Sequence, residues 1–342
     1  MSAQRAQDLM KQINAALKAP VLKMAGDEAL KVTYLPTGVL PIDNLTGGGI
    51  PRGRFTTITG DWSTLKSYVG LRAIAQTQAD GGVCALIDTE HAFDPEWATQ
   101  LGVDVDALIL QHPESGELAI DVAEALIRAK VDLIVFDSVA ATLPESERSK
   151  RLHEETPQPA RIAALMSLAM RRLTAANDKT AIIWINQLRM QIGVTFGNPE
   201  IATGGKALPY YSSYIINIRK AGKITRPVKQ WDGTEWKDGK ETYAQKFRAY
   251  MEKSKLSAPH REVYFIWDYE QNAVDEVGYL IAAGLESGVI TREGNAGWKM
   301  GRTKVNGRAK FKEKVASSPE MQAKLRTSIF PGSPEADSPK DE

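Results

Sequence analysis

A cluster of chemically competent residues follows the β-branched run Phe55–Thr59. The segment is Gly60-Asp61-Trp62-Ser63-Thr64-Leu65-Lys66-Ser67, and a helical pattern begins at its lysine. A glycine, a lysine and a hydroxyl residue at this spacing, between a strand and a helix, are typical of a loop that binds nucleotide phosphates. In such a loop the backbone N–H groups face phosphate oxygens, the lysine reaches the β- and γ-phosphates, and the hydroxyl group holds Mg²⁺.

Leu65 departs from this motif, because the pattern G-x-x-x-x-G-K-[ST] has glycine at that position. A side chain there can crowd the phosphates or prevent the backbone geometry that the loop needs. The motif alone therefore leaves two interpretations open, a nucleotide site and an ordinary strand-to-helix turn.

Carboxylates at the ends of two further apolar runs favour the nucleotide site. Asp137 follows Leu133–Phe136, where an acid orients Mg²⁺ or its water, and Glu90 follows Ile87, where a carboxylate can polarise the attacking water. Each acid by itself is better explained as a helix cap or a surface charge at a strand end. Three such features at successive strand ends predict a site in which Lys66 contacts phosphates and Ser67 and Asp137 hold Mg²⁺.

The elements that must position these residues alternate between apolar runs and helical patterns. We expect strands at 55–59, 83–87, 107–110, 133–136 and 181–185, and helices near 66–79, 95–101, 117–129 and 159–176. Apolar runs between helices indicate parallel strands buried on both faces, so the fold class is a doubly wound α/β domain with ligands at the carboxyl ends of its strands. Strands at 214–218, 243–250 and 263–267 suggest antiparallel extensions of this sheet, with a polar hairpin tip at 229–240.

Composition excludes several classes of protein. The 342 residues include 43 Lys plus Arg and 42 Asp plus Glu, so the formal charge is +1 and any nucleic-acid site must be local. The single cysteine, Cys84, excludes a disulfide framework and a Cys-cluster zinc site, and its apolar surroundings predict a buried structural thiol. No apolar run approaches the roughly 20 residues of a membrane span. We expect a soluble cytoplasmic protein with no membrane partner.

The sequence closely resembles the bacterial RecA recombinase family, including its phage-encoded members, from about Leu35 to Ile329. The resemblance is carried by TGGGIPRGR at 46–54, IDTEHAFDP at 87–95, FDSVAA at 136–141, and INQLRMQIGVTFGNPE at 185–200 with TGG at 203–205. It implies a RecA-like P-loop NTPase core with a mostly parallel sheet, an N-terminal helix and a small C-terminal α+β domain. It also implies an ATP- and single-stranded-DNA-dependent recombinase. Such a protein forms a helical filament and promotes homologous pairing and strand exchange in the cytoplasm of a bacterium or phage-infected host.

The resemblance assigns roles at an ATP site. Glu90 activates water, Gln187 senses the γ-phosphate, and Lys253 and Lys255 reach the γ-phosphate bound by a neighbouring subunit. The residues expected to contact ATP are Gly60, Asp61, Trp62, Ser63, Thr64, Leu65, Lys66, Ser67, Asp137, the adenine neighbours Asp94 and Trp97, and Tyr269 from the next subunit. The two lysines are two residues apart and share one face of a strand, which alone indicates only a solvated edge.

Two loops face DNA in the family, and they correspond to about 145–159 and 188–204. The residues of the second loop that are expected to bind single-stranded DNA are Arg189, Met190, Gly197, Asn198, Thr203 and Gly204. Independently, that stretch has few acids and several amides and glycines, which suits phosphate contacts. An ordinary surface loop is the alternative, although so long an aperiodic stretch is unusual unless it is functional.

The resemblance also implies a domain organisation. Residues 1–32 are a helix and linker for docking on an adjacent subunit, 33–272 are the ATPase core, 273–330 are a basic domain, and 331–342 are a disordered tail. Seven Lys or Arg and one Glu between Arg292 and Lys312 suit double-stranded DNA, with a solubilising face as the alternative. An open helical filament arises because a head-to-tail interface does not close.

Leu65 leaves the function open between two classes. In the leading hypothesis ATP binds, the loop adjusts and hydrolysis is slower. In the second, Leu65 abolishes turnover, and the chain is a non-hydrolysing single-strand DNA filament or mediator protein. A ring-forming helicase of the same ATPase superfamily is a third hypothesis, which the FGNPE…TGG loop and the basic C-terminal region disfavour.

Overall fold

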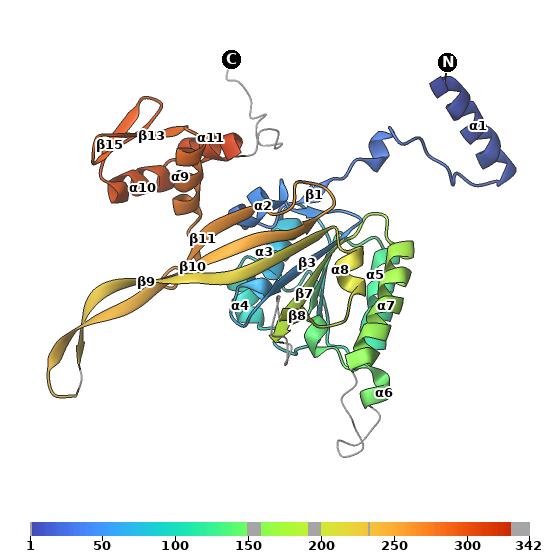
Figure 1. Ribbon diagram of the computed structural model, residues 1–342, viewed down its shortest axis with the longest axis horizontal. Coiled ribbons are helices and arrows are strands. Elements are labelled where there is room, and N and C mark those ends of the chain that lie inside the picture. Colours follow the sequence, from blue (N-terminus) through green and yellow to red (C-terminus); the bar gives the residue numbers. More distant parts are fainter. Residues whose placement is uncertain (1, 149–158, 191–199, 232, 330–342) are drawn as a thin grey trace. The chain divides into compact units, whose positions relative to one another are not determined.

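A computed structural model describes residues 2–148, 159–190, 200–231 and 233–329 (Figure 1). The predicted tail at 331–342 lies outside these residues. The chain divides into two compact units, Met1–Thr33 and Tyr34–Glu342. The first unit contains α1 (Ser2–Ala16) and a short 3-10 helix at Glu28–Leu30, and it leaves Leu9, Ile13 and Leu17 exposed. No described helix has both the length and the apolar character needed to cross a bilayer.

The second unit is built on a ten-stranded sheet in the order β12-β11-β10-β9-β3-β7-β6-β4-β5, with β8 paired to β7. The parallel strands are β3 (Phe55–Gly60), β4 (Cys84–Asp88), β5 (Leu108–Gln111), β6 (Leu133–Asp137), β7 (Ala181–Met190) and β9 (Tyr214–Trp231). The antiparallel strands are β8 (Glu200–Ala202), β10 (Trp236–Ser254), β11 (Glu262–Asp268) and β12 (Ala273–Val274). The predicted α/β fold with a mostly parallel sheet is confirmed.

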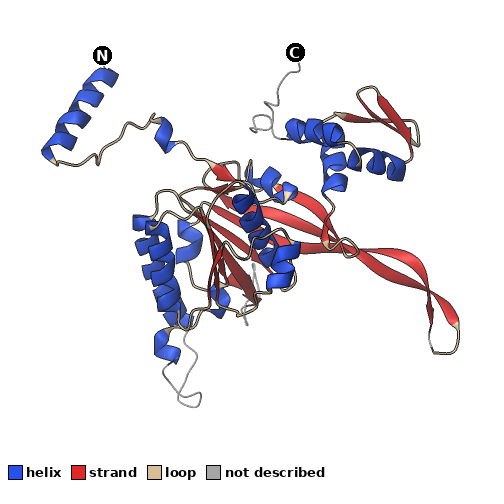
Figure 2. Ribbon diagram, turned by 180° about the vertical axis from the view of Figure 1, so that it is seen from behind, coloured by secondary structure: helices blue, strands red, loops and turns tan. Residues whose placement is uncertain are grey.

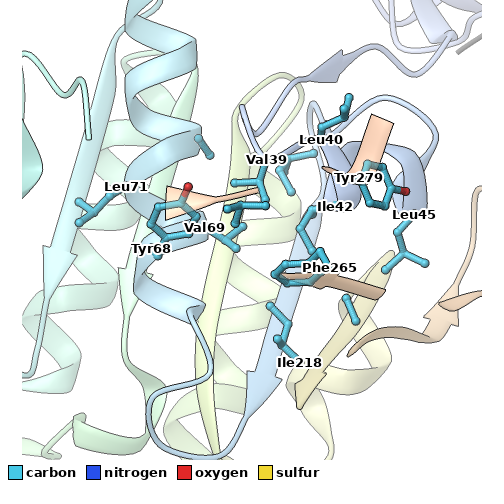
Figure 3. Packing of buried hydrophobic residues seen from close by; sticks show 14 of the residues in the cluster. Val39, Leu40, Ile42, Leu45, Tyr68, Val69, Leu71, Ile218, Phe265 and Tyr279 are labelled. Carbon is cyan, nitrogen blue, oxygen red and sulfur yellow. The ribbon is translucent and has the colours of Figure 1, made fainter. Parts of the chain in front are cut away.

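Alternate residues of the central strands face two separate cores, which explains their continuous apolar sequences. In β6, Leu133 and Val135 belong to one core, and Ile134 and Phe136 belong to the other. The first core includes α2 (Leu40–Thr46) and α3 (Lys66–Ala79), and Figure 3 shows part of its packing. The second core lies under α5 (Gly116–Arg128) and α7 (Pro159–Ala176), which cover the opposite face in Figure 2. Cys84 is buried in the first core, as predicted.

The structure corrects two sequence expectations. β9 was expected to be antiparallel to the core strands, but Thr56 pairs with Tyr214 in a parallel ladder with β3, because α8 (Ala207–Tyr211) returns the chain to the opposite end of the sheet. The hairpin tip was expected at 229–240, but β9 continues to Trp231 and β10 begins at Trp236. A two-stranded ribbon with water on both faces needs no apolar alternation, so its polar sequence concealed the strands.

The C-terminal region combines helices with a small sheet. It contains α9 (Glu276–Glu286), β13 (Ile290–Glu293), β14 (Gly297–Met300), β15 (Thr303–Asn306), α10 (Arg308–Ala316) and α11 (Pro319–Ile329). This combination agrees with the predicted small α+β domain, and the three strands lie in and around the basic stretch. Tyr279 of α9 accepts a hydrogen bond from Asn44 of α2 at 2.6 Å, so α9 packs against the core. The remaining elements are β1 (Tyr34–Leu35), β2 (Ile50–Pro51), α4 (Pro95–Gln100), α6 (Glu145–Arg148) and a 3-10 turn at Val139–Ala141.

Candidate nucleotide site and DNA loops

The loop from Gly60 to Ser67 joins β3 to α3 at the carboxyl end of the central sheet. The Lys66 ammonium donates to the Asp61 carbonyl oxygen at 2.7 Å and lies 3.4 Å from the Thr64 hydroxyl, which itself donates to the Asp61 carbonyl. Ser63 adopts a positive φ of 53°. Leu65 is the N-cap residue of α3, and no side chain caps this end of the helix. The loop therefore closes around the lysine, and the N–H groups of the first helical turn stay available to an anion.

Leu65 takes the backbone conformation that a glycine provides in such loops. Its φ is 65° and its ψ is 20°, in the left-handed region, which costs a non-glycine residue roughly 1–2 kcal/mol. Its side chain is half-buried and packs against the core on the α3 side of the sheet. The departure from the motif therefore leaves the loop geometry in place, at the expense of local strain.

The Ser67 hydroxyl donates to the Asp137 carboxylate at 2.6 Å, so the two predicted Mg²⁺ ligands are in direct contact. Burial raises the pKa of the Asp137 carboxyl from 3.8 to about 6, the Ser67 hydrogen bond opposes that rise, and Glu90 and Asp88 add to it. Burial lowers the pKa of Lys66, and Asp137 and Glu90 partly counter that effect. A divalent cation bound here would relieve the mutual repulsion of these carboxylates.

Glu90 is held by two donors from neighbouring strands. Its Oε1 accepts hydrogen bonds from the Ser138 hydroxyl at 2.5 Å and from Gln187 Nε2 at 2.8 Å. Gln187 lies beside Gly60 in the parallel ladder of β3 and β7, so the register itself brings the glutamine to the nucleotide loop. Ser138 was absent from the sequence-based prediction, although its position directly after Asp137 at a strand end was an available signal.

Asp88 organises the loop that carries Glu90. Its carboxylate is 3% exposed and accepts hydrogen bonds from the backbone N–H groups of Glu90, Ala92 and Phe93 at 2.8–3.0 Å. His112 Nε2 lies 3.2 Å from the same carboxylate. Asp88 was absent from the sequence-based prediction, because nothing in a single sequence shows which nearby N–H groups will donate to a carboxylate.

Lys220 is a third residue of this region that was absent from the sequence-based prediction. Gly60 pairs with Ile218 in the β3–β9 ladder, so Lys220 of β9 lies alongside the loop, and its Nζ is 3.6 Å from the centre of the exposed Trp62 ring. Its charge also contributes to the lowered pKa of Lys66. This cation–π pair fixes a positive charge at the edge of the nucleotide loop.

The expected adenine contacts remain predictions. Asp94 caps α4 by accepting from the backbone N–H groups of Glu96 and Trp97 at 2.9 and 3.3 Å, and the Trp97 side chain is half-buried against the core. The Tyr269 side chain is exposed just beyond β11. These positions keep the three residues near the surface without showing what they bind.

Lys253 and Lys255 lie at the opposite end of the sheet from the nucleotide loop of the same chain. Lys253 pairs with Ile215 near the start of β9, whereas the loop follows Gly60, which pairs with Ile218. Both ammonium groups donate to the Tyr210 carbonyl, at 3.0 and 2.9 Å. Burial lowers the pKa of Lys253, and the charge of Lys255 adds to this effect. The pair therefore cannot contribute to the site formed by its own subunit.

The second DNA loop begins in the strand that carries Gln187. β7 continues through Arg189 and Met190, which pair with Ile201 and Glu200 of β8, so the predicted loop 188–204 includes a short hairpin at its base. The Thr203 carbonyl oxygen accepts a hydrogen bond from Asn186 Nδ2 at 2.8 Å. The next residue, Gly204, has a φ of +91°. Gly197 and Asn198 lie outside the described residues, as does most of the first loop, 149–158. That first loop begins with the helix α6 rather than with irregular chain.

The sequence model of the RecA N-terminal domain matches residues 4–272, which is more than three quarters of the chain. The chain belongs to the RecA family. Protein RecA of Cutibacterium acnes is 37% identical over 322 residues, covering 91% of this chain and 88% of that protein. Protein RecA of Chlorobium chlorochromatii is 38% identical over 335 residues, covering 94% of this chain and 90% of that protein. Protein RecA of Rhodospirillum centenum is 36% identical over 353 residues, covering 96% of this chain and 94% of that protein. The RecA resemblance seen in the sequence is thus confirmed over nearly the whole chain.

Proposed function

We propose that this RecA-family chain hydrolyses ATP in a filament on single-stranded DNA, at sites that two adjacent subunits share. Its family membership gives the chain a function in DNA recombination and repair, and members of the family are DNA-dependent ATPases that use ATP with Mg²⁺. The proposal adds hydrolysis by this chain, the shared site and the route by which DNA is sensed.

One run of contacts carries the proposal. Gln187 pairs with Gly60 in the β3–β7 ladder and donates a hydrogen bond to Glu90. Its strand, β7, continues into the hairpin at the base of the second DNA loop. A single strand thus connects the residue that would activate water with the loop that would grip DNA. A change at either end can be transmitted through the rigid ladder of the strand.

The described residues suit Mg²⁺ and the phosphates of ATP. Ser67 and Asp137 present two oxygen atoms side by side, and no group of three or more His, Cys, Asp or Glu among the described residues forms a metal cage. Mg²⁺ commonly takes one or two protein oxygens together with substrate phosphates and water. Ser67 and Asp137 would hold the ion, whose charge would offset that of the phosphates, while Lys66 would contact the phosphates and Glu90 would polarise the attacking water.

The placement of the two lysines supports completion of the site by a neighbour. Lys253 and Lys255 lie at the far end of their own sheet, so a nucleotide loop within their reach would belong to another subunit. Cations there would neutralise charge that develops in phosphoryl transfer. A head-to-tail arrangement of this kind builds an open filament. A helix as short as α1 is marginal in water by itself and needs a surface to pack against, which an adjacent subunit would provide.

The geometry of Leu65 favours turnover over the non-hydrolysing alternative. Its backbone already has the conformation of the missing glycine, and its side chain packs against the core. Purified chain should therefore hydrolyse ATP faster with single-stranded DNA than without it, and Glu90→Gln should abolish the stimulated rate. Bound DNA with no turnover would favour the non-hydrolysing filament. No nucleotide binding at millimolar ATP would contradict the nucleotide site itself.

A further inference from the structure

The β9–β10 hairpin extends past the sheet as a two-stranded ribbon (Figures 1 and 2). β9 pairs with β3 only from Tyr214 to Ile218, and β10 pairs with β11 only from Ala244 to Tyr250. Among the described residues, the strand pairing of 219–231 and 236–242 is only across the hairpin. At about 3.4 Å per residue, the ribbon extends roughly 40 Å beyond the sheet.

The ribbon carries a local excess of positive charge. Residues 219–243 include seven Lys or Arg and four Asp or Glu, whereas the whole chain has a net charge of only +1. Positive charge gathered on one projecting element attracts a polyanion even when the protein as a whole is almost neutral.

The cations are divided unevenly between the two faces of the ribbon. Side chains on a strand alternate, so Lys223 and Lys229 share one face of β9, and Lys240 joins them because it pairs with Pro227. The exposed Trp236 lies on this face at the tip. Among the described residues Asp238 is the one acid on it, and neither Lys223 nor Lys240 has a carboxylate partner. We call this surface the lysine face.

The opposite face has fewer cations, and a larger share of them form ion pairs with carboxylates. It carries Arg226 and Lys237, with Glu241 opposite Arg226 in the ladder. Arg226 forms ion pairs with Glu241 at 2.9 Å and Glu270 at 2.7 Å, and Lys237 pairs with Glu235 at 3.3 Å. The two faces thus form a matched pair for experiment, with the same backbone and different free charge.

We propose that the lysine face binds the phosphate backbone of duplex DNA, with the ribbon lying along a groove. This inference rests on the proposed function, in which the chain acts on DNA, and it adds a duplex contact outside the loops and the basic C-terminal region. The major groove of B-DNA is about 12 Å wide and admits a two-stranded β-ribbon. Lysines along the rim reach phosphates, which position the protein without reading sequence. Single-strand sites instead stack bases on successive aromatic side chains, whereas the aromatic positions of this face, Trp231 and Trp236, are paired at the tip and lysines and threonines lie along the rest.

The test compares Lys223→Gln/Lys240→Gln with the control Arg226→Gln/Lys237→Gln, each removing two positive charges from the same ribbon. Binding of a fluorescent duplex of mixed sequence to the full chain is followed by anisotropy as NaCl is raised. The slope of log K against log salt falls by about 0.9 for each lost phosphate contact. The lysine-face variant should therefore lose about two units of slope, and the control should lose much less than one.

Three outcomes would overturn the inference: no duplex binding by the unmodified chain, equal losses in both variants, or an unchanged slope in the lysine-face variant. Single-strand-stimulated ATP turnover is measured in parallel and should be unchanged in both variants. If the lysine-face variant lost turnover and filaments together, the ribbon would be a subunit contact and the inference would be wrong. If the unmodified chain bound duplex through the lysine face but had no ATPase activity, the proposed function would fail and the ribbon inference would stand.

Discussion

Leu65 offers a sharp test of the account, because its backbone is strained and its side chain is packed. Two substitutions separate these effects. Leu65→Ala removes the packing but keeps a Cβ atom at a φ of 65°, whereas Leu65→Gly removes the packing and the strain together. Alanine normally stabilises a chain relative to glycine by about 0.5–1 kcal/mol, through the entropy of the unfolded state.

At Leu65 the left-handed conformation reverses that order. Relief of about 1–2 kcal/mol of strain exceeds the entropic penalty of glycine. We therefore expect Leu65→Gly to be more stable than Leu65→Ala by about 0.5–1 kcal/mol. Both should be less stable than the unmodified chain or close to it, because a half-buried leucine contributes roughly 1–2 kcal/mol of packing. Because the side chain packs against the core, ATP affinity should change by less than about threefold, or roughly 0.6 kcal/mol.

Urea denaturation of the three proteins, with ATP binding followed by titration, measures both quantities. Equal stability of the two variants, or a more stable Leu65→Ala, would show that the backbone at this position is not strained. A tenfold gain in ATP affinity in Leu65→Gly alone would show that the leucine side chain crowds the phosphates. The stability result would refute the strain assigned to Leu65, and the affinity result would refute the reasoning that the loop tolerates its side chain.

Three further substitutions test the site. Asp88→Ala should leave three backbone N–H groups without their acceptor. We therefore expect kcat to fall more than tenfold, with a smaller change in the KM for ATP. Equal changes in kcat and KM would instead indicate that nucleotide binding is lost. Ser138→Ala should lower kcat by a smaller factor, because Gln187 still donates to Glu90, and an unchanged kcat would remove Ser138 from the site. Asp137→Asn should lose Mg²⁺-dependent turnover yet be more stable at pH 7 by about 1–3 kcal/mol. Since the folded-state pKa of Asp137 is raised from 3.8 to about 6, the folded state binds the extra proton, and stability due to this group falls as pH rises from about 4 to 6. Burial also raises the pKa of Asp43 to about 7, so both proteins should lose stability across that range, and urea melts should show a smaller loss in Asp137→Asn than in the unmodified chain.

The apolar strands could be predicted because parallel strands buried on two faces leave a continuous apolar signature. Phe55–Gly60, Leu133–Asp137 and the strand beginning at Ala181 all lie where the sequence places them, within a residue or a few. The polar residues at the carboxyl ends of these strands identified the candidate site, because the carboxyl ends of parallel strands meet at one edge of the sheet.

Other features depend on contacts between residues far apart in the sequence. The donors to Glu90 come from the residue after β6 and from β7, and no single-sequence pattern specifies which donor will reach which acceptor. The direction of β9 and the length of its ribbon were missed because a ribbon exposed to water on both faces carries no alternating apolar pattern. The far-end position of Lys253 and Lys255 required the register of β9 and β10, which strand-by-strand prediction does not provide.

The central claim is that each ATP site is shared by two subunits, and mixing two inactive variants tests it most directly. Glu90→Gln lacks the water-activating acid but keeps Lys253, and Lys253→Ala lacks the lysine but keeps Glu90. In a filament assembled from equal amounts, about a quarter of interfaces pair an intact loop with an intact lysine. We predict single-strand-stimulated turnover near a quarter of the unmodified rate from the mixture and almost none from either variant alone. A mixture as inactive as its components, although it forms filaments on DNA, would contradict the shared site.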